Sequence, residues 1–304
     1  MNRRALLSRL ARNLTGLGLA AGAQVSARQE SAYRAPYRLR FRHPVEELEA
    51  GFAEAPWNGA QFESAVPAQE WYSPRVLHKF GAWGPPARQY PAPPALERRD
   101  PAWMQDRVIH AASFWINYPY QHHHIPDWDP PAQWPWHRVA TGRNSRGIDC
   151  SNLSSFCFNY ALGIKLDTAI HTQAERREVR GPGGREILAI GIVGRASYDE
   201  LLTRLHPADL LYIRNEQGRL AHVILWLGQV GVSPARTPLI LDSTSSGHRD
   251  SNGVRIPGGV QIRPFSRNSW YARDFSHAHR IIPGVGQVRA GEVAEAEEGG
   301  ALID

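Results

Sequence analysis

The chain has 304 residues, which is enough for one or two domains with a sizeable core. Its formal net charge of +6 comes from 35 Lys and Arg against 29 Asp and Glu, and nearly all of the positive residues are arginines. Because these arginines are scattered and form no dense basic run outside the N-terminus, the composition argues against nucleic-acid binding. No stretch beyond the N-terminus is long and apolar enough for a membrane helix, so a soluble mature protein is expected.

Residues 1–27 have the pattern of an export signal. The positively charged "MNRRALLSRLARN" precedes the short apolar "LTGLGLAAGA", and "VSA" supplies small residues for cleavage after Ala27. The pair Arg3-Arg4 also resembles the start of a twin-arginine signal. We therefore expect a periplasmic or secreted protein, and we leave the export route open.

Residues 28–100 are rich in proline, aromatic residues and arginine, and they show little periodicity. We expect an irregular N-terminal extension that packs its tryptophans onto the main domain, with a small separate domain as the alternative. The segment 284–304 is acidic and rich in glycine and alanine, a composition typical of disorder. The main domain is therefore predicted to span residues 101–283.

Two helices are predicted in the first half of this domain. Apolar residues recur at helical spacing from Pro101 to the Tyr-Pro-Tyr of the following turn. A long, proline-rich loop, 121–147, comes next and is either functional or poorly ordered. The second helix is predicted to run from Cys150 to about Leu162, with Gly163 placed to end it.

The second half of the domain has the pattern of β-strands separated by turns. "ADLLYIRN" and "LAHVILWLG" flank the turn Glu216-Gln217-Gly218 and are predicted to pair with each other. The apolar run "EILAIGIVG" precedes them, and three further strands are predicted in "TPLILDSTSSG", "GVQIRPF" and "FSHAHRII". A helix before several antiparallel strands predicts an α+β fold.

The only two cysteines of the chain, Cys150 and Cys157, lie in the second predicted helix. Seven residues of helix separate them by about 10.5 Å along the axis, whereas a disulfide needs Cα atoms within about 7 Å. We therefore predict two free thiols. Cys157 continues an apolar stripe with Leu153, Phe156 and Tyr160, so it is predicted to be buried in the core.

Cys150 has different surroundings, because it begins the helix between the polar capping residues Asp149 and Ser151. The positive end of the helix dipole favours a thiolate there, which makes Cys150 a candidate nucleophile. A nucleophile needs a base and an orienting group. His222 and Asp242 each interrupt an apolar strand, so they are the candidates for these roles, although a lone histidine in a strand is more often a structural residue.

Two groups of histidines leave a metal site open as an alternative: His122, His123 and His124 with Asp127 and Asp129, and the pair His277 and His279. Adjacent histidines in a loop rarely all bind one ion, so the loop histidines, His124 among them, are predicted to contact substrate instead. We expect His277 and His279 to pack within the sheet and the protein to need no metal or other cofactor. His248 ranks second to Asp242 as the orienting residue.

The order of these motifs resembles the NlpC-type cysteine peptidases, which cut the stem peptides of peptidoglycan. The resemblance covers about residues 101–283 and includes a Pro-Tyr, an Asp-Cys-Ser that starts a helix, "PADLLY" and "HVILWLG". The chain departs from the usual pattern in having Asn152 after Asp-Cys-Ser and three histidines after Pro-Tyr. The resemblance implies a papain-like α+β fold, with the nucleophile helix packed on an antiparallel sheet.

Carried over residue by residue, the resemblance implies that Cys150 is the nucleophile and His222 the base. Asp242 occupies the position of the third residue, which is commonly another histidine in the family. Asp149 and Ser151 would help to hold the free amine of the substrate. Tyr120, from the Pro-Tyr, would lie near the nucleophile and contact substrate.

The expected function is therefore an exported cysteine peptidase that cleaves peptidoglycan stem peptides. Two alternatives stay open at this point. One is a non-catalytic wall-binding protein on the same fold, because fold does not determine function. The other is a metal-dependent hydrolase that uses the histidine groups.

Overall fold

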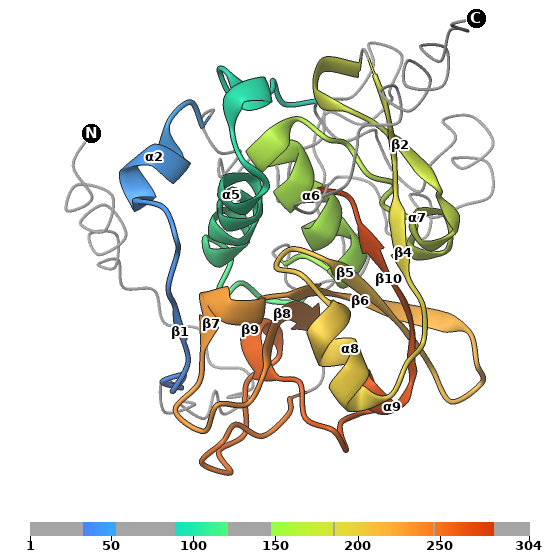
Figure 1. Cartoon of the computed structure of the whole chain (residues 1–304). Coiled ribbons are helices and arrows are strands. Elements are labelled where there is room, and N and C mark those ends of the chain that lie inside the picture. Colours follow the sequence, from blue (N-terminus) through green and yellow to red (C-terminus); the bar gives the residue numbers. More distant parts are fainter. Residues whose placement is uncertain (1–32, 53–88, 121–146, 185, 246, 283–304) are drawn as a thin grey trace, which may run out of the picture. The chain divides into compact units, whose positions relative to one another are not determined.

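The computed structural model describes residues 33–52, 89–120, 147–184, 186–245 and 247–282 (Figure 1). The chain divides into two compact units, Met1–Arg34 and Ala35–Asp304. All of the helices and strands below belong to the second unit.

A six-stranded antiparallel sheet forms the centre of this unit, with the strand order β4-β10-β5-β6-β8-β9. The strands are β4 (Gly191–Val193), β5 (Leu210–Arg214), β6 (Leu220–Trp226), β8 (Leu239–Thr244), β9 (Gly259–Pro264) and β10 (Phe275–Arg280). Each of the predicted strand segments contributes to this sheet. The predictions of antiparallel strands and of a mixed α+β fold are therefore confirmed.

The hairpin of β5 and β6 pairs Tyr212 with Val223 and closes through the predicted turn. The side chain of Asn215 accepts hydrogen bonds from the backbone N–H groups of Gln217, at 3.1 Å, and Arg219, at 3.0 Å. An asparagine that bonds the backbone two and four residues ahead stabilises a turn locally. The hairpin therefore follows from short-range sequence signals.

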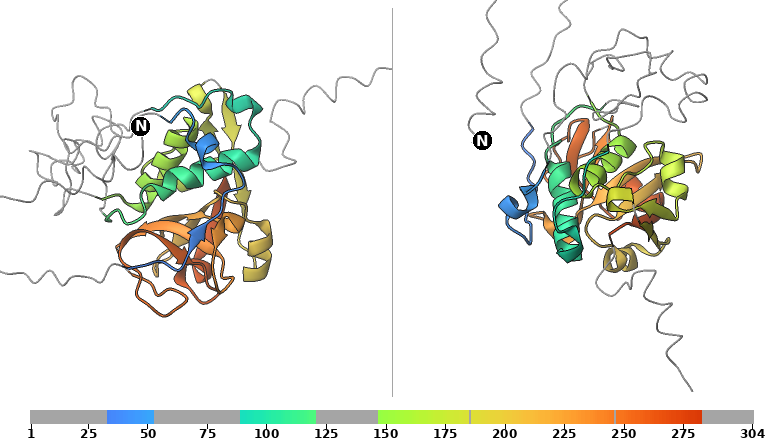
Figure 2. Two further views of the ribbon diagram at one scale, coloured as in Figure 1. Left: turned by 90° about the vertical axis from the view of Figure 1, so that its left-hand side faces the viewer. Right: turned by 90° about the horizontal axis from the view of Figure 1, so that it is seen from above.

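Four helices pack around the sheet: α5 (Pro101–Ser113), α6 (Cys150–Leu162), α8 (Tyr198–Arg204) and α9 (Trp270–Arg273). Helices α5 and α6 pack on each other, and α6 packs on β6 and β8. Figure 2 shows these two green helices side by side against the orange strands. Leu201 of α8, Leu205 directly after it and Tyr271 of α9 belong to a hydrophobic core with the sheet.

The remaining elements are short. They are β1 (Arg38–Leu39), α2 (Val45–Glu49), η2 (Leu96–Arg98), α7 (Ile170–Glu175), β2 (Glu178–Arg180), η3 (Pro182–Gly184), β3 (Ile187–Ala189), η4 (Gly228–Val230) and β7 (Gly231–Val232). Strands β2 and β3 form a hairpin, and β1 pairs with β7. The predicted apolar run "EILAIGIVG" is thus divided between β3 and β4.

Capping residues determine where the two long helices begin and end. The side chain of Asp100 accepts a hydrogen bond from the N–H of Trp103 at 2.7 Å, and Asp149 does the same for Asn152 at 2.9 Å. Such caps satisfy backbone donors that have no partner within the helix. Gly163 ends α6 in the left-handed conformation, with φ of 68°. The predicted bounds of α6 are confirmed.

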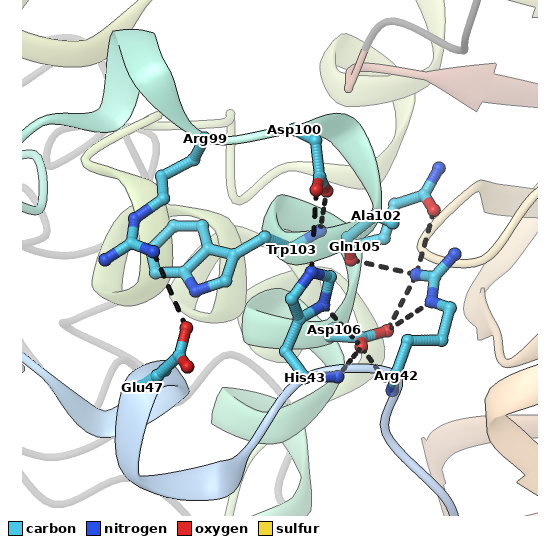
Figure 3. Close-up of polar contacts among 9 residues, drawn as sticks. All are labelled: Arg42, His43, Glu47, Arg99, Asp100, Ala102, Trp103, Gln105 and Asp106. Carbon is cyan, nitrogen blue, oxygen red and sulfur yellow. Dashed lines mark hydrogen bonds and ion pairs between the residues drawn. The ribbon is translucent and has the colours of Figure 1, made fainter.

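Residues 42–50 of the N-terminal extension lie against α5. Arg42 donates from Nε to Oδ1 of the buried Asp106 at 2.9 Å, as Figure 3 shows. The buried Arg107 donates to the backbone carbonyls of Leu48 and Ala50 in and after α2. Polar contacts from α5 therefore hold this segment in place.

Several predictions concern residues outside the described ranges. The export signal 1–27, the tail 284–304 and the tryptophans Trp57, Trp71 and Trp83 of the extension are among them. Within the described ranges, the helices are too short or too polar to span a lipid bilayer.

Candidate active site

Cys150 is the first residue of α6, and the two residues before it are fixed by their neighbours. The N–H of Ile148 donates to the carbonyl of Pro119 at 3.0 Å, and the hydroxyl of Ser243 on β8 donates to the carbonyl of Ile148. Asp149 then caps the helix. The nucleophile candidate is therefore attached both to the sheet and to the segment that ends at Tyr120.

Gly259 lets this segment approach the sheet closely. The N–H of Asn117 donates to the carbonyl of Val260 at 2.9 Å, and the N–H of Val260 donates to the carbonyl of Tyr118 at 2.9 Å. Gly259 has a φ of 94°, and a Cβ there would lie 2.2 Å from the carbonyl oxygen of Tyr118. A residue with a side chain would be strained and would also displace the segment that leads to Tyr120.

Tyr120 lies within electrostatic reach of the candidate nucleophile, as the resemblance implies. Burial raises the pKa of Tyr120 well above its ordinary value, and the charges of Asp149 and Cys150 raise it further. The phenol of Tyr120 is therefore neutral at neutral pH. A contact of Tyr120 with substrate stays a prediction.

His222 on β6 and Asp242 on β8 meet as direct partners. Nε2 of His222 lies 2.9 Å from Oδ2 of Asp242, and the two side chains are 7% and 0% exposed. The Cys150 side chain also acts on His222, both by its charge and as a hydrogen-bond partner. Because Nε2 faces Asp242, Nδ1 is the ring nitrogen left to exchange a proton with Cys150.

The electrostatics favour a charged imidazole. Burial alone would lower the pKa of His222, but the charge of Cys150 and the hydrogen bonds to Asp242 and Cys150 outweigh burial and raise the pKa to about 10. Burial would likewise raise the pKa of Asp242, but His222, Arg263 and Tyr271 hold it below its ordinary value. The interactions of His222 with Cys150 and Asp242 therefore favour the protonated form of its ring.

The sequence reasoning missed two residues that contact Asp242. Nε of Arg263 on β9 donates to Oδ1 at 2.6 Å, and the hydroxyl of Tyr271 on α9 donates to Oδ2 at 2.7 Å. A signal for Arg263 was present, because this residue interrupts the apolar strand "GVQIRPF" much as His222 interrupts its own strand. Tyr271 belongs to a four-residue helix, and no pattern in the sequence indicated it.

The hydrogen bond that joins His248 to the site is made to Tyr271 and not to His222. Nε2 of His248 lies 3.1 Å from the hydroxyl of Tyr271, which in turn donates to Asp242. Burial lowers the pKa of His248. The geometry therefore favours Asp242 over His248 as the residue that orients His222.

The side chains of Asp149 and Ser151 make hydrogen bonds within the protein. Oδ1 of Asp149 accepts from both the backbone and the side-chain nitrogen of Asn152, each at 2.9 Å. The hydroxyl of Ser151 donates to the carbonyl of Thr168 at 2.7 Å. These contacts give both residues a structural role at the start of α6, and their contact with a substrate amine stays a prediction.

The remaining histidines divide into two groups. His122, His123 and His124 lie outside the described residues. On β10, Nε2 of His277 lies 3.1 Å from the carbonyl of Ala174, and the buried ring of His279 packs on Tyr212 with 4.6 Å between centroids. Burial lowers the pKa of both histidines, to about 3 for His279, which is typical of neutral rings packed in a sheet. No group of three or more His, Cys, Asp or Glu side chains in the described ranges is arranged to hold a metal ion.

Neither cysteine forms a disulfide, and only one is accessible. Cys157 is 1% exposed within the core, whereas the side chain of Cys150 is partly exposed. The predictions of two cysteines without a disulfide and of a buried Cys157 are confirmed. A reagent in solution should therefore reach Cys150 alone.

A cavity of about 460 Å³ lies at the C-terminal end of α6, where Gly163, helix α7 and strand β2 line it. Its lining includes Gln173, whose amide accepts from the hydroxyls of Ser154 and Tyr212, each at 3.2 Å. Tyr212 also lines the cavity. Burial raises the pKa of Tyr212, and the charge of Cys150 raises it further. The described residues that line this cavity do not include Cys150, His222 or Asp242.

The arrangement as a whole brings a partly exposed thiol, a buried imidazole and a buried carboxylate together in that order. These are the parts of a nucleophile, a proton donor or acceptor and an orienting group. No known protein-family model matches the chain, and a search of curated proteins finds no significant relative.

Proposed function

We propose that the protein is an exported cysteine hydrolase that cleaves amide bonds in the stem peptides of the cell wall. The observation that carries the proposal is the buried pair in which Nε2 of His222 lies 2.9 Å from Oδ2 of Asp242, with the side chain of Cys150 near enough to act on the same imidazole. Neither the thiol nor the histidine alone would indicate catalysis. Their combination with an orienting carboxylate is typical of an activated nucleophile.

The reaction would proceed through a thioester. The Cys150 thiolate attacks the amide carbonyl, a C–S bond forms, and the carbonyl electrons move onto oxygen. Collapse of this intermediate breaks the C–N bond, and His222 gives its proton to the leaving amine. A water molecule, deprotonated by His222, then attacks the thioester and releases the acid and the thiolate.

The start of α6 would stabilise the oxyanion. Cys150 is the first residue of the helix, so its N–H is one of the backbone donors that have no acceptor within the helix. The side chain of Asp149 accepts a hydrogen bond from the backbone N–H of Asn152. The backbone N–H of Cys150 would then donate to the substrate oxygen. Such a donor is typically worth about 100- to 1000-fold in rate.

The substrate class rests on the resemblance to NlpC-type peptidases. A nucleophile at the start of a helix that packs on an antiparallel sheet supports a papain-like arrangement, and Tyr120 near Cys150 supports the role of the Pro-Tyr. The pattern of residues 1–27 supports export to the compartment that contains peptidoglycan. No metal or other cofactor takes part in the proposed steps.

Mass spectrometry of muropeptides tests this proposal. The mature protein is incubated with purified muropeptides next to the variants Cys150→Ala and Cys157→Ala. We expect new fragments with the wild type and with Cys157→Ala, and none with Cys150→Ala. The fragment masses would identify the bond.

Equal fragments from the wild type and Cys150→Ala would exclude Cys150 as the nucleophile. Absence of fragments from every variant, with folding verified by circular dichroism, would contradict a stem-peptide hydrolase. It would then favour the wall-binding alternative, which a pull-down on insoluble peptidoglycan would detect.

A further inference from the structure

Arg263 is a fully buried cation directly behind the proposed catalytic residues. Its side chain is 0% exposed, and Nε donates to Oδ1 of Asp242 at 2.6 Å. Nη2 donates to the carbonyls of Pro257 at 2.8 Å and Gly259 at 3.2 Å, while Nη1 has no partner among the described residues. Burying an arginine costs free energy that a simple packing role would not require, because an apolar residue could fill the same space.

The two oxygens of Asp242 have separate partners. Oδ1 accepts from Arg263, whereas Oδ2 faces His222 at 2.9 Å and accepts from Tyr271 at 2.7 Å. A carboxylate fixed through one oxygen cannot rotate away from the partner of the other. Arg263 therefore determines which way Asp242 presents its second oxygen.

The charges around His222 come from several elements. The titratable or charged groups that face it are Cys150 on α6, Asp242 on β8, Arg263 on β9 and Tyr271 on α9, with His248 behind Tyr271. The positive charge of Arg263 and the negative charge of Asp242 offset each other. The positive charge of the imidazolium is then left without a counter-charge unless Cys150 ionises.

We propose that Arg263 is a positioning residue that acts through Asp242: it holds Oδ2 toward His222, and it cancels the carboxylate charge so that the imidazolium pairs with the Cys150 thiolate. This inference rests on the proposed function, in which Cys150 is the nucleophile. It predicts that loss of Arg263 disfavours the thiolate, because an uncompensated carboxylate then lies close to it.

Alkylation of Cys150 measures the thiolate without any substrate. The mature protein reacts with iodoacetamide at about pH 6 and about pH 8.5, and peptide mass spectrometry follows Cys150 with the buried Cys157 as internal reference. We define the alkylation ratio as the rate for Cys150 at the lower pH divided by the rate at the higher pH. We expect Arg263→Met to lower this ratio about tenfold, which is the effect of one nearby charge in a partly screened site. Arg263→Lys, which keeps the charge, should recover most of the ratio.

A matched control breaks another Arg–Asp pair of the same sheet. Nη2 of Arg280 on β10 lies 2.7 Å from Oδ2 of Asp209, and their side chains are 13% and 2% exposed. In the described residues this pair makes no contact with His222 or Asp242. Arg280→Met should destabilise the protein but leave the alkylation ratio within about twofold of the wild type.

A second pair of variants keeps the test decisive if Arg263→Met does not fold. Asp242→Asn is compared with the double variant Asp242→Asn/Arg263→Met, in which both charges of the buried pair are absent. If Arg263 acts through Asp242, the second substitution should change the alkylation ratio less than about threefold in this background. A tenfold further change there, or an unchanged ratio in a folded Arg263→Met variant, would overturn the proposal.

The outcomes also separate this inference from the proposed function. A shifted alkylation ratio together with no muropeptide cleavage would support the role of Arg263 and reject the substrate class. Negligible alkylation of the wild type at about pH 6 would reject the thiolate nucleophile itself, and the role of Arg263 with it.

Discussion

Two buried carboxylates in this protein are each held by an arginine and a histidine. Asp106 on α5 accepts from Nε of Arg42 at 2.9 Å and from Nη2 at 2.7 Å, and Nδ1 of His43 lies 3.2 Å from its other oxygen (Figure 3). Asp242 on β8 has the same kinds of partner. In composition the two clusters are alike.

Their surroundings differ. Around Asp106 the side chains of Arg42 and His43 are 28% and 23% exposed, whereas Arg263 and His222 around Asp242 are 0% and 7% exposed. The first cluster joins the N-terminal extension to α5, and the second faces a thiol. Residue types alone therefore do not identify a catalytic site; the burial and the neighbouring nucleophile do.

Removal of the two histidines should distinguish the clusters most strongly. If the proposed mechanism holds, His222→Ala should lower the rate of muropeptide cleavage by about 1000-fold or more, because the leaving amine then loses its proton donor. His43→Ala should leave the rate within about twofold, because the described contacts of His43 are with Asp100 and Asp106 and not with the site.

The control for this experiment is the fold, verified for both variants by circular dichroism and thermal unfolding. A large loss of activity in His43→Ala with an intact fold would show that the comparison is wrong. The N-terminal cluster would then have to contribute to catalysis as well.

The two aspartates should also differ in stability. Asp242→Asn leaves the fully buried Arg263 without a counter-charge, which should lower the free energy of unfolding by about 3 kcal/mol or more. Asp106→Asn should cost only about 1 kcal/mol, because Arg42 can turn its charge toward solvent. Urea unfolding of the wild type, Asp242→Asn and Asp106→Asn at neutral pH gives both losses in the free energy of unfolding. A larger loss for Asp106→Asn than for Asp242→Asn would contradict this prediction.

Much of the site follows from local patterns in the sequence. Asp149 and Gly163 cap α6 at both ends, so the position of Cys150 at the start of a helix is determined by neighbours in the chain. His222 and Asp242 stand out because they interrupt apolar strands. These signals act over a few residues, and this is why the bounds of α6 and the three residues could be predicted, whereas α5 ends at Ser113 and not, as predicted, at the Tyr-Pro-Tyr.

Other parts of the site depend on contacts between distant segments. Arg263 lies near the end of its strand, a position where an arginine ordinarily faces solvent, and only the packing of β8 and β9 shows that it is buried. Tyr271 lies in a helix of one turn, and Asp106 lies among ordinary polar residues of α5. Their partners are between 21 and 64 residues away in the chain, beyond the reach of periodicity or capping rules.

The pH dependence of stability tests the charged state of His222 itself. The folded protein raises the pKa of His222 to about 10, through the charge of Cys150 and the hydrogen bonds to Asp242 and Cys150 that outweigh burial. A histidine in the unfolded chain has a pKa of about 6.5. The stabilisation from protonated His222 is therefore complete below about pH 6.5 and is lost as the pH rises toward 10.

The measurement compares the free energy of unfolding of the wild type and His222→Gln across this range. We expect the advantage of the wild type to shrink by on the order of 2 kcal/mol between about pH 6.5 and 10. His279→Gln, measured between about pH 3 and 6.5, is the control with the opposite sign, because burial lowers the pKa of His279 to about 3 and its stabilisation is lost as the pH falls through that range. A wild-type advantage that does not change on the alkaline side would mean that His222 is neutral in the folded protein, and the imidazolium would then not be available to pair with Cys150.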